Sequence, residues 1–458
     1  MNLAAIPGSP LTGTASLPGD KSISHRSALF AGLSSGECQV KNFLVAGVTQ
    51  VMLESLSALG VDWSLDGTTL RVQGAGLHRT VDSANPVRLD CGNSGTSMRL
   101  LAGAAAALGL PVILDGSERL RSRPMRRITA PLQRMGVEIQ ASPQGTAPLS
   151  LSARLKDHKL RPLEYTLPVA SAQVKSCLLL AALDAEGETV LREPGPSRDH
   201  TERMLRAMGA EVESRKISSS DNGIDQFETR FLPPDPLELQ PFNLVLPGDF
   251  SSAAFLIVAA VITPGSQIEL RGVGLNPTRI GLLDVLQAMG ADITITNQHE
   301  SCGEPLGDLH VRYSNLNSVT VSGPTVVRMI DEFPVFAVAA AYAQGRTVVA
   351  EAEELRHKES DRIHDLCREL NRLGADLEEA PDGFTVNGGK ALGGGQADSH
   401  GDHRLAMALA VAGLAAKGAV EIEGAGILTE SYPQFSQTLQ DLGANVNYWS
   451  QGSPGFDA

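Results

Sequence analysis

Few of the residue types that mark a specialised class of protein are abundant in this chain of 458 residues. Aromatic residues make up only 4%, so a core must be built from aliphatic side chains. The five cysteines are scattered and form no C-x-x-C pair, which argues against a disulfide framework and against a structural zinc site. No apolar run has the length of a membrane span, and residues 1–10 lack the basic and apolar segments of a signal peptide. These absences predict a cytoplasmic protein.

Positive charge is also scarce. The chain has 52 acidic and 38 basic residues, a formal net charge of −14. This balance argues against nucleic acid or an anionic membrane surface as the partner. The chain contains no P-loop, no strand-linked G-x-G-x-x-G and no G-x-S-x-G motif, so nucleotide, dinucleotide and serine-hydrolase functions lack support.

A repeated pattern of helix, glycine and strand organises the whole chain. In one form an amphipathic helix is followed by Leu or Met, Gly, Ala or Val and then a strand, at Gly60, Gly136, Gly209, Gly290, Gly374 and Gly443. A second form alternates with it and has a more uniformly apolar helix before the glycine. Its glycines are Gly36, Gly109, Gly187, Gly265, Gly345 and Gly418, 73 to 80 residues apart. The alternation predicts six α/β units, each with one buried and one half-exposed helix.

A duplicated segment predicts two halves of three units each. Leu17-Pro-Gly-Asp20 recurs as Leu246-Pro-Gly-Asp249, and each copy leads into serines and an apolar helix. We therefore predict one domain over residues 20–246 and a second over residues 1–19 plus 247–458. The short strand expected around residues 11–17 would belong to the second domain.

The first copy of this duplication carries charges that the second copy lacks. Lys21, Ser22, His25 and Arg26 stand where a Pro-Gly turn enters a helix. A helix start offers unpaired backbone N–H groups and the positive end of the helix dipole, and the two cations and the hydroxyl add to both. In an acidic chain this concentration of positive charge indicates a specific anionic ligand.

Other predicted helix starts and loops also carry polar groups, which a pure core would not favour. They are Asn93-Ser-Gly-Thr-Ser97 with Arg99, Ser171-Ala-Gln173 with Lys175, Asp331-Glu332, Asp402-His-Arg404, the Arg-rich segment 118–127, Arg198 and Lys358-Glu-Ser-Asp-Arg362. Such cation clusters without a set of metal-binding carboxylates indicate a phosphate held by cations alone. Asp331 and Glu359 stand among the cations and are candidates for proton transfer.

With these motifs in view, the chain resembles the 5-enolpyruvylshikimate-3-phosphate synthases from about Leu11 to about Leu442. The resemblance rests on Pro18-Gly-Asp-Lys-Ser-Ile-Ser-His-Arg26, Gly92-Asn-Ser-Gly-Thr96, Arg123-Pro124, Ser171-Ala-Gln-Val-Lys175, Lys358-Glu-Ser-Asp-Arg362 and Gly401-Asp-His-Arg404. It implies an α/β fold of two domains, each with three βαβαββ units, and an active site in the cleft between them. It also implies transfer of the enolpyruvyl group of phosphoenolpyruvate to the 5-hydroxyl of shikimate 3-phosphate, with release of phosphate, by a monomer that needs no metal or other cofactor.

The same resemblance implies two sets of substrate-binding residues. Those expected to hold shikimate 3-phosphate are Lys21, Ser22, Arg26, Ser171, Ala172, Gln173, Arg198, Asp331 and Lys358. Those expected to hold phosphoenolpyruvate are Lys21, Gly95, Arg123, Gln173, Arg362 and Arg404. Both substrates are strongly anionic, which explains the need for several Arg and Lys side chains.

The expected chemistry leaves one role open. Asp331 would accept the proton of the 5-hydroxyl, and either Glu359 or Lys21 would protonate the methylene carbon of phosphoenolpyruvate. Binding of the anionic substrates should also draw the two halves together, because it neutralises the cations on both.

Three positions depart from the family's common pattern. Arg198 stands where Tyr is frequent, Glu430 where Lys is frequent and Leu100 where Pro is frequent. Arg198 keeps a contact with the 3-phosphate, whereas Glu430 removes a cation expected near phosphoenolpyruvate. Gly95 leaves room for glyphosate, the family's inhibitor at the phosphoenolpyruvate site, so inhibition is expected.

Two other functions are alternatives. The UDP-N-acetylglucosamine enolpyruvyl transferases share the implied fold, but carry a reactive Cys in a loop of the first half, and the comparable segment 118–127 has none. A non-catalytic protein that binds a phosphorylated ligand is a more remote alternative, and Asp331 and Glu359 argue against it.

Overall fold

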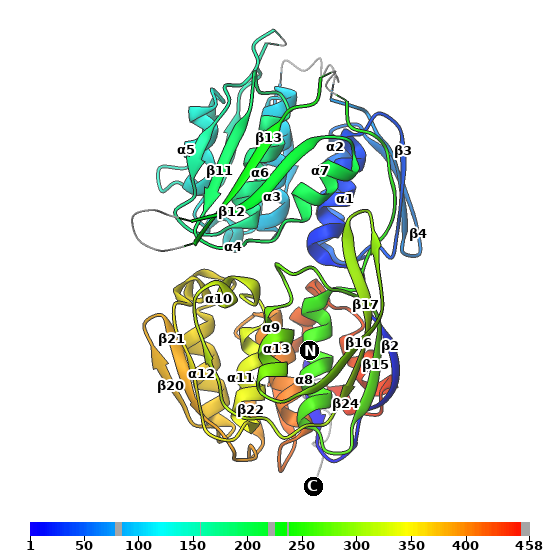
Figure 1. The fold of residues 1–458 in the computed structure, drawn as a ribbon, viewed down its shortest axis with the longest axis vertical. Helices are drawn as coiled ribbons and strands as arrows, with labels where there is room; N and C mark the ends of the chain where they lie inside the picture. Colours follow the sequence, from blue (N-terminus) through cyan, green and yellow to red (C-terminus); the bar gives the residue numbers. More distant parts are fainter. Residues whose placement is uncertain (78–84, 156, 219–224, 236–237, 450–458) are drawn as a thin grey trace. The chain divides into compact units, whose positions relative to one another are not determined.

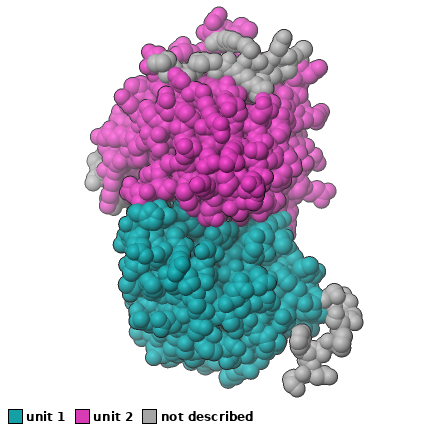
Figure 2. Space-filling model, turned by 90° about the vertical axis from the view of Figure 1, so that its right-hand side faces the viewer, with its two compact units in different colours: residues 1–18, 247–299, 305–458 teal, residues 19–246, 300–304 magenta. Residues whose placement is uncertain are grey.

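The chain folds into two compact units. The computed structural model describes residues 1–77, 85–155, 157–218, 225–235 and 238–449 (Figure 1). Unit 1 consists of Met1–Pro18, Pro247–His299 and Pro305–Ala458, and unit 2 consists of Gly19–Leu246 and Glu300–Glu304 (Figure 2). Unit 2 corresponds to the predicted first domain, and unit 1 to the predicted second domain. Residues 300–304 lie in the predicted second domain but group with unit 2. The reason is local: His200 Nδ1 lies 2.7 Å from Glu304 Oε1, and Arg203 Nη1 donates to the Gly303 carbonyl.

Each unit contains three four-stranded sheets within the described residues. Unit 2 has the strand orders β14-β3-β5-β4, β6-β7-β9-β8 and β10-β11-β13-β12, and unit 1 has β2-β15-β17-β16, β18-β19-β21-β20 and β22-β23-β1-β24. In every sheet the first pair of strands is parallel, as in β6 with β7, and the other pairs are antiparallel, as in β7 with β9. One arrangement is therefore used six times.

The strands are short. In unit 2 they are β3 (Glu37–Lys41), β4 (Asp62–Asp66), β5 (Thr69–Gln73), β6 (Val87–Asp90), β7 (Val112–Asp115), β8 (Ile139–Gln140), β9 (Leu149–Leu151), β10 (Glu164–Thr166), β11 (Thr189–Glu193), β12 (Glu211–Ser218), β13 (Asp225–Leu232) and β14 (Asn243–Val245). The remaining strands are β1 (Asn2–Ile6), β2 (Thr12–Ser16), β15 (Gln267–Gly274), β16 (Asp292–Ser301), β17 (Glu304–Arg312), β18 (Thr320–Val321), β19 (Arg346–Val349), β20 (Leu377–Ala380), β21 (Gly383–Asn387), β22 (Gly395–Asp398), β23 (Val420–Glu423) and β24 (Asn445–Trp449).

Two of these strands, β2 of unit 1 and β14 of unit 2, take equivalent places in their sheets. The strand predicted around residues 11–17 is β2, which pairs in parallel with β15 of unit 1. The corresponding place beside β3 of unit 2 is taken by β14. The chain therefore leaves unit 1 after β2 and returns to it after β14.

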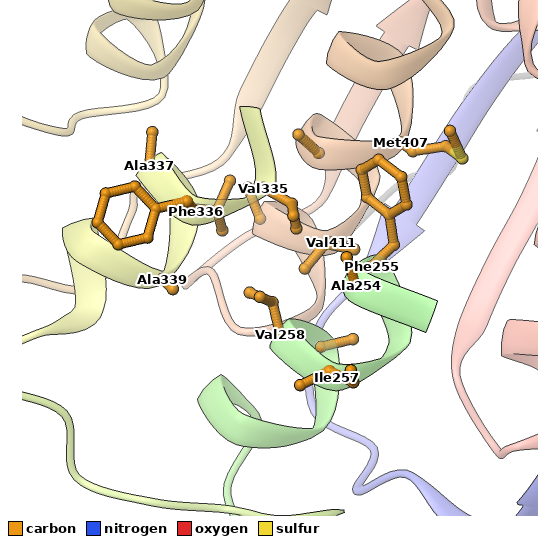
Figure 3. Close-up of a cluster of buried hydrophobic side chains, with 14 of the residues drawn as sticks. Ala254, Phe255, Ile257, Val258, Val335, Phe336, Ala337, Ala339, Met407 and Val411 are labelled. Atoms are coloured by element: carbon orange, nitrogen blue, oxygen red, sulfur yellow. The ribbon is translucent and has the colours of Figure 1, made fainter. Parts of the chain in front are cut away.

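Three buried helices form the centre of each unit. They are α1 (Lys21–Leu33), α3 (Gly95–Leu108) and α6 (Ala172–Ala182) in unit 2, and α8 (Phe250–Ile262), α11 (Phe333–Tyr342) and α13 (His403–Leu414) in unit 1. In unit 1 the side chains of α8, α11 and α13 pack against one another, as Val258, Val335 and Val411 illustrate (Figure 3). All thirteen residues of α8 are buried, because this segment has no polar face to turn to solvent.

The other helices are more exposed. The amphipathic ones are α2 (Gly47–Ala58), α5 (Arg126–Arg134), α7 (His200–Ala207), α9 (Gly281–Ala288), α12 (Arg362–Arg372) and α14 (Phe435–Asp441), and the shorter ones are α4 (Glu118–Arg121), α10 (Pro324–Arg328), η1 (Glu353–His357) and η2 (Ala425–Glu430). No helix among the described residues has the length and apolarity that a bilayer span requires.

The turn glycines confirm the predicted helix ends. The glycines that follow the amphipathic helices all have left-handed backbones. Their φ angles lie between 71° and 99° at Gly60, Gly136, Gly209, Gly290, Gly374 and Gly443. A side chain with Cβ is strained at such φ values, so glycine favours the stop of the helix and the turn into the strand.

Candidate active site

The first turn of α1 in unit 2 carries two of the predicted ligands, and a third lies beside it. Asp20 caps this helix by accepting a hydrogen bond from the backbone N–H of Ile23 at 2.9 Å. Lys21 and Ser22 follow at the first two helical positions and are half-buried. Arg198, which comes from the loop before α7, places Nη1 3.4 Å from Ser22 Oγ. The structure thus brings together Lys21, Ser22 and Arg198 at a helix N-terminus, where an anion is favoured.

Arg26 lies one turn deeper and is only 2% exposed. Its guanidinium donates to Thr201 Oγ1 at 2.8 Å, Ser176 Oγ at 2.7 Å and the Ser22 carbonyl at 2.9 Å. Burial lowers its pKa to about 10, so the side chain remains a cation near neutral pH. Because a guanidinium has five N–H donors, these bonds fix the side chain and still leave donors for a ligand.

His25 connects the start of α1 to the start of α3. Nδ1 lies 2.7 Å from the Lys21 carbonyl, and Nε2 lies 3.2 Å from Ser94 Oγ, the N-cap of α3. Burial, together with the charges of Lys21 and Arg26, lowers the pKa of His25 to about 4, although backbone hydrogen bonds oppose the shift. His25 is therefore neutral under physiological conditions and holds the two helix starts in register.

The start of α3, the Arg-rich segment and the start of α6 meet around Gly95. A Cβ built on Gly95 would lie 3.1 Å from Arg123 Nη1 and 3.3 Å from Arg99 Nη1. Arg99 donates to Gln173 Oε1, and Gln173 Nε2 donates to Thr96 Oγ1 at 2.9 Å. The predicted ligands Gly95, Arg123 and Gln173 are thus assembled. Arg99, absent from the predicted ligand sets, belongs to the same cluster, and its i+4 spacing from Gly95 could have indicated this.

The motif Ser171–Lys175 divides into two roles. Ser171 is the N-cap residue of α6, but its side chain makes no capping hydrogen bond, and Ser171 and Ala172 are half-buried. Lys175 instead is buried, with Nζ 2.7 Å from Glu193 Oε1 and 2.8 Å from Glu202 Oε1.

This buried ion pair positions the loop that carries Arg198. Ser197 Oγ donates to Glu193 Oε2 at 2.6 Å, while the other oxygen of Glu193 accepts from Lys175. Burial lowers the pKa of Lys175, but the charges of Glu193 and Glu202 outweigh it, so the net shift is upward. Lys175 therefore remains charged and anchors the residue before Arg198.

Unit 1 gathers the other predicted residues at the starts of α11, α12 and α13. Arg362 Nη1 lies 3.4 Å from Asp331 Oδ1, and Arg404 Nη2 lies 3.7 Å from Asp331 Oδ2. Arg362 Nη2 lies 2.6 Å from Glu359 Oε2. Two cations and two carboxylates from separate helix starts therefore share one region of this unit.

Asp402 holds both Arg362 and Arg404 in place through hydrogen bonds. It accepts from Arg362 Nε at 2.7 Å and from the backbone N–H of Arg404 at 2.8 Å, and it caps α13. Burial lowers the pKa of Arg362, but the charges of Asp402, Glu359 and Asp331 outweigh it and raise the pKa overall. Arg362 is therefore a permanent cation at this site.

Lys358 is the remaining predicted ligand of unit 1, and it lies among the charges of Asp331, Glu359 and Arg362. Burial lowers its pKa, as does the charge of Arg362, while Asp331 and Glu359 oppose the shift without cancelling it. A lowered pKa makes this ammonium group a better proton donor than an exposed lysine. Glu430, the last residue of η2, is half-buried and makes no ion pair with the described residues. Among those residues, no cluster of three His, Cys, Asp or Glu side chains is suited to hold a metal ion.

The fold and these residues define a class of enzyme: a two-unit α/β protein whose helix starts carry cations for anionic small molecules, with carboxylates placed among them. Comparison with known proteins identifies the family. The model of the EPSP synthase (3-phosphoshikimate 1-carboxyvinyltransferase) family matches residues 6–439. The 3-phosphoshikimate 1-carboxyvinyltransferase of Gloeobacter violaceus is 48% identical over 436 residues, which cover 94% of this chain and 97% of that protein. The protein of the same name from Geobacter sp. (strain M21) is 46% identical over 442 residues, covering 96% and 99%.

A solved structure agrees with the sequence relatives. The EPSP synthase of Acinetobacter baumannii superposes with a TM-score of 0.85 at 37% identity, covering 97% of this chain and 99% of that chain. The chain belongs to the EPSP synthase family. It is a 3-phosphoshikimate 1-carboxyvinyltransferase of the shikimate pathway, which serves aromatic amino acid biosynthesis. The predicted resemblance, α/β fold class and transferase function are confirmed, and the UDP-N-acetylglucosamine alternative is not supported.

Proposed function

We propose that this enzyme transfers the enolpyruvyl group of phosphoenolpyruvate to the 5-hydroxyl of shikimate 3-phosphate with the side chains predicted from the sequence. One observation carries the proposal. Arg404 is only 4% exposed, and its guanidinium lies 3.7 Å from Asp331 and 3.9 Å from Glu332, too far for strong hydrogen bonds. Its side chain donates no hydrogen bond to the described residues. A buried cation whose charge is compensated while its donors stay unused is suited to bind an anionic ligand.

The ligand sets are those that the family resemblance implies. Shikimate 3-phosphate is assigned to Lys21, Ser22, Arg26, Ser171, Ala172, Gln173, Arg198, Asp331 and Lys358, with Ser171 and Arg198 at its 3-phosphate. Phosphoenolpyruvate is assigned to Lys21, Gly95, Arg123, Gln173, Arg362 and Arg404. Each set takes residues both from residues 20–246 and from the remainder of the chain. Monomeric state and cytoplasmic location stay predictions.

In the proposed mechanism Asp331 accepts the proton of the 5-hydroxyl as that oxygen attacks C2 of phosphoenolpyruvate. Glu359 or Lys21 gives a proton to the methylene carbon, and a tetrahedral ketal phosphate forms. Loss of a methyl proton and departure of phosphate then restore the double bond. The distance of 3.4 Å between Arg362 and Asp331 keeps the carboxylate oriented without a tight bond. Glu359 lies 2.6 Å from Arg362, so its action as the acid requires that bond to open.

The test is phosphate release from phosphoenolpyruvate in the presence and absence of shikimate 3-phosphate. Release that needs both substrates supports the proposal. Asp331→Asn should lower turnover by at least about a hundredfold with both substrates still binding, because general-base catalysis contributes about 10²- to 10⁴-fold. Asp376→Asn is the matched control, since Asp376 is exposed in the same unit.

Three results would contradict the proposal. Near-normal turnover by Asp331→Asn would remove this residue as the base. Release with UDP-N-acetylglucosamine in place of shikimate 3-phosphate would favour the sister activity, and binding of phosphoenolpyruvate without any release would favour a binding protein.

A further inference from the structure

In unit 1 a chain of hydrogen-bonded, buried polar groups ends at Glu332, which lies 3.9 Å from Arg404. Arg279, Asp249, Ser251 and Glu332 are all at most 3% exposed. Arg279 Nη2 donates to Asp249 Oδ1 and, at 2.9 Å, to Ser251 Oγ. Ser251 Oγ in turn donates to Glu332 Oε1. Burying a charged group without a partner is costly, so this series of hydrogen bonds fixes Glu332 from the core side.

Glu332 and its neighbour Asp331 face the same cation in different ways. Arg404 lies 3.9 Å from Glu332 Oε1 and 3.7 Å from Asp331 Oδ2. The Glu332 side chain is completely buried, whereas that of Asp331 is 19% exposed. One carboxylate is therefore held within the core, and the other remains accessible to a substrate.

We propose that Glu332 is a positioning residue that acts as the permanent counterion of Arg404. Held by Ser251 and Arg279, it compensates the charge of Arg404 and leaves Asp331 able to accept a proton. The inference rests on the proposed binding of phosphoenolpyruvate by Arg404. Without Glu332 the full charge of Arg404 would act on Asp331, stabilise its carboxylate form and weaken it as a base.

The other charged groups near Asp331 do not replace Glu332. Arg362 and Lys358 are cations and act on Asp331 in the same direction as Arg404. Glu359 and Asp402 are anions, but their closest cation is Arg362, at 2.6 Å and 2.7 Å. Glu332 is thus the carboxylate that offsets Arg404 without being accessible to substrate.

The test is Glu332→Gln, which keeps an oxygen that can accept from Ser251 but removes the charge. We expect the KM for phosphoenolpyruvate to fall by about threefold to tenfold, because Arg404 attracts the anion more strongly. We expect kcat to fall by about tenfold, because Asp331 becomes a weaker base. The KM for shikimate 3-phosphate should stay within about twofold of its original value. A merely structural role of Glu332 would instead leave the KM for phosphoenolpyruvate unchanged or raise it.

Three further variants make the outcome decisive. Glu332→Asp restores the charge and should return the KM for phosphoenolpyruvate toward its original value. Glu423→Gln removes an exposed carboxylate of the same unit and should change neither constant. If Glu332→Gln does not fold, the double variant Arg279→Gln/Glu332→Gln removes one buried charge of each sign and should show the same fall in KM and kcat.

Arg404→Gln separates the failure of this inference from the failure of the proposed function. It should raise the KM for phosphoenolpyruvate at least tenfold. If it does not, the assignment of phosphoenolpyruvate to Arg404 is wrong, and the role of Glu332 falls with it. If it does, but loss of the Glu332 charge leaves the KM unchanged or raises it, the role of Glu332 alone is overturned.

Discussion

Arg362 Nε donates to Asp402 Oδ2 at 2.7 Å, and the two side chains are almost completely buried. This ion pair joins the first residue of α12 to the N-cap of α13, and so fixes two proposed phosphoenolpyruvate ligands, Arg362 and Arg404, with one carboxylate. Loss of the Asp402 charge would leave the buried guanidinium of Arg362 with only Glu359 and Asp331 as counterions, and both of these are partly exposed.

Asp402→Asn should therefore lower the free energy of unfolding by about 3–5 kcal/mol, measured by denaturant unfolding. Asp361→Asn is the matched control, because Asp361 caps α12 but is more exposed. It should cost about 1 kcal/mol, as loss of a helix cap does. Equal costs for the two variants would show that the buried pair is not what stabilises this region.

Arg198→Gln tests the assignment of the 3-phosphate. Arg198 lies beside Ser22 at the start of α1, and its loop is anchored through Ser197, Glu193 and Lys175. We expect the KM for shikimate 3-phosphate to rise by about tenfold to a hundredfold, since a charge-assisted hydrogen bond contributes about 1.5–3 kcal/mol. The KM for phosphoenolpyruvate should change little. Arg206→Gln, on the exposed side of α7, serves as the control, and a similar effect from it would contradict the assignment.

Gly95→Ala tests the space beside Arg123. The added methyl would lie 3.1 Å from Arg123 Nη1, close enough to displace the end of this flexible side chain. We expect a rise of about threefold to tenfold in the KM for phosphoenolpyruvate and a larger loss of glyphosate inhibition, because displacement of Arg123 weakens a charge-assisted contact. Steady-state kinetics and inhibitor titration measure both. Gly47→Ala is the control, as its methyl would meet no atom within 4 Å.

Glyphosate also tests the original enzyme. Inhibition by millimolar glyphosate, competitive with phosphoenolpyruvate, is the expected outcome. If the enzyme is indifferent to that concentration, Gly95 does not provide the predicted room, whatever the effect of the substitution.

His25 should make stability depend on acidity. Its pKa is lowered from 6.5 to about 4 in the folded chain, so the unfolded chain binds more protons between these values. The stabilisation is complete above about pH 6.5 and is lost as the pH falls toward 4, by about 3 kcal/mol in total. His25→Gln should reduce the fall in stability between pH 7.5 and pH 4.5 by a comparable amount. Denaturant midpoints at both pH values measure this, with the exposed His158→Gln as the control; an identical fall in the original protein and in His25→Gln would refute it.

Much of the fold could be predicted from the sequence because the relevant signals are local. The stop of an amphipathic helix at Gly60 or Gly374 needs only a left-handed turn, and an unbroken apolar segment such as Phe250–Ile262 can be accommodated only inside the protein. The motifs that predicted the family are also short and contiguous. The helix starts next to Lys21, Gly95, Glu332 and Arg404 were therefore predicted without a structure.

The tertiary structure decided what each charged residue does, because that depends on partners far along the chain. Lys175 shares a motif with Gln173, yet Glu193 and Glu202 hold it in a buried ion pair. Adjacent Asp331 and Glu332 have the same charge, but only Glu332 is bonded to Ser251, 81 residues earlier, and closed off from solvent. Local sequence determines helices and turns through backbone conformation and hydrophobic pattern, whereas burial and charge pairing are properties of the packed units, which bring distant segments within hydrogen-bonding distance.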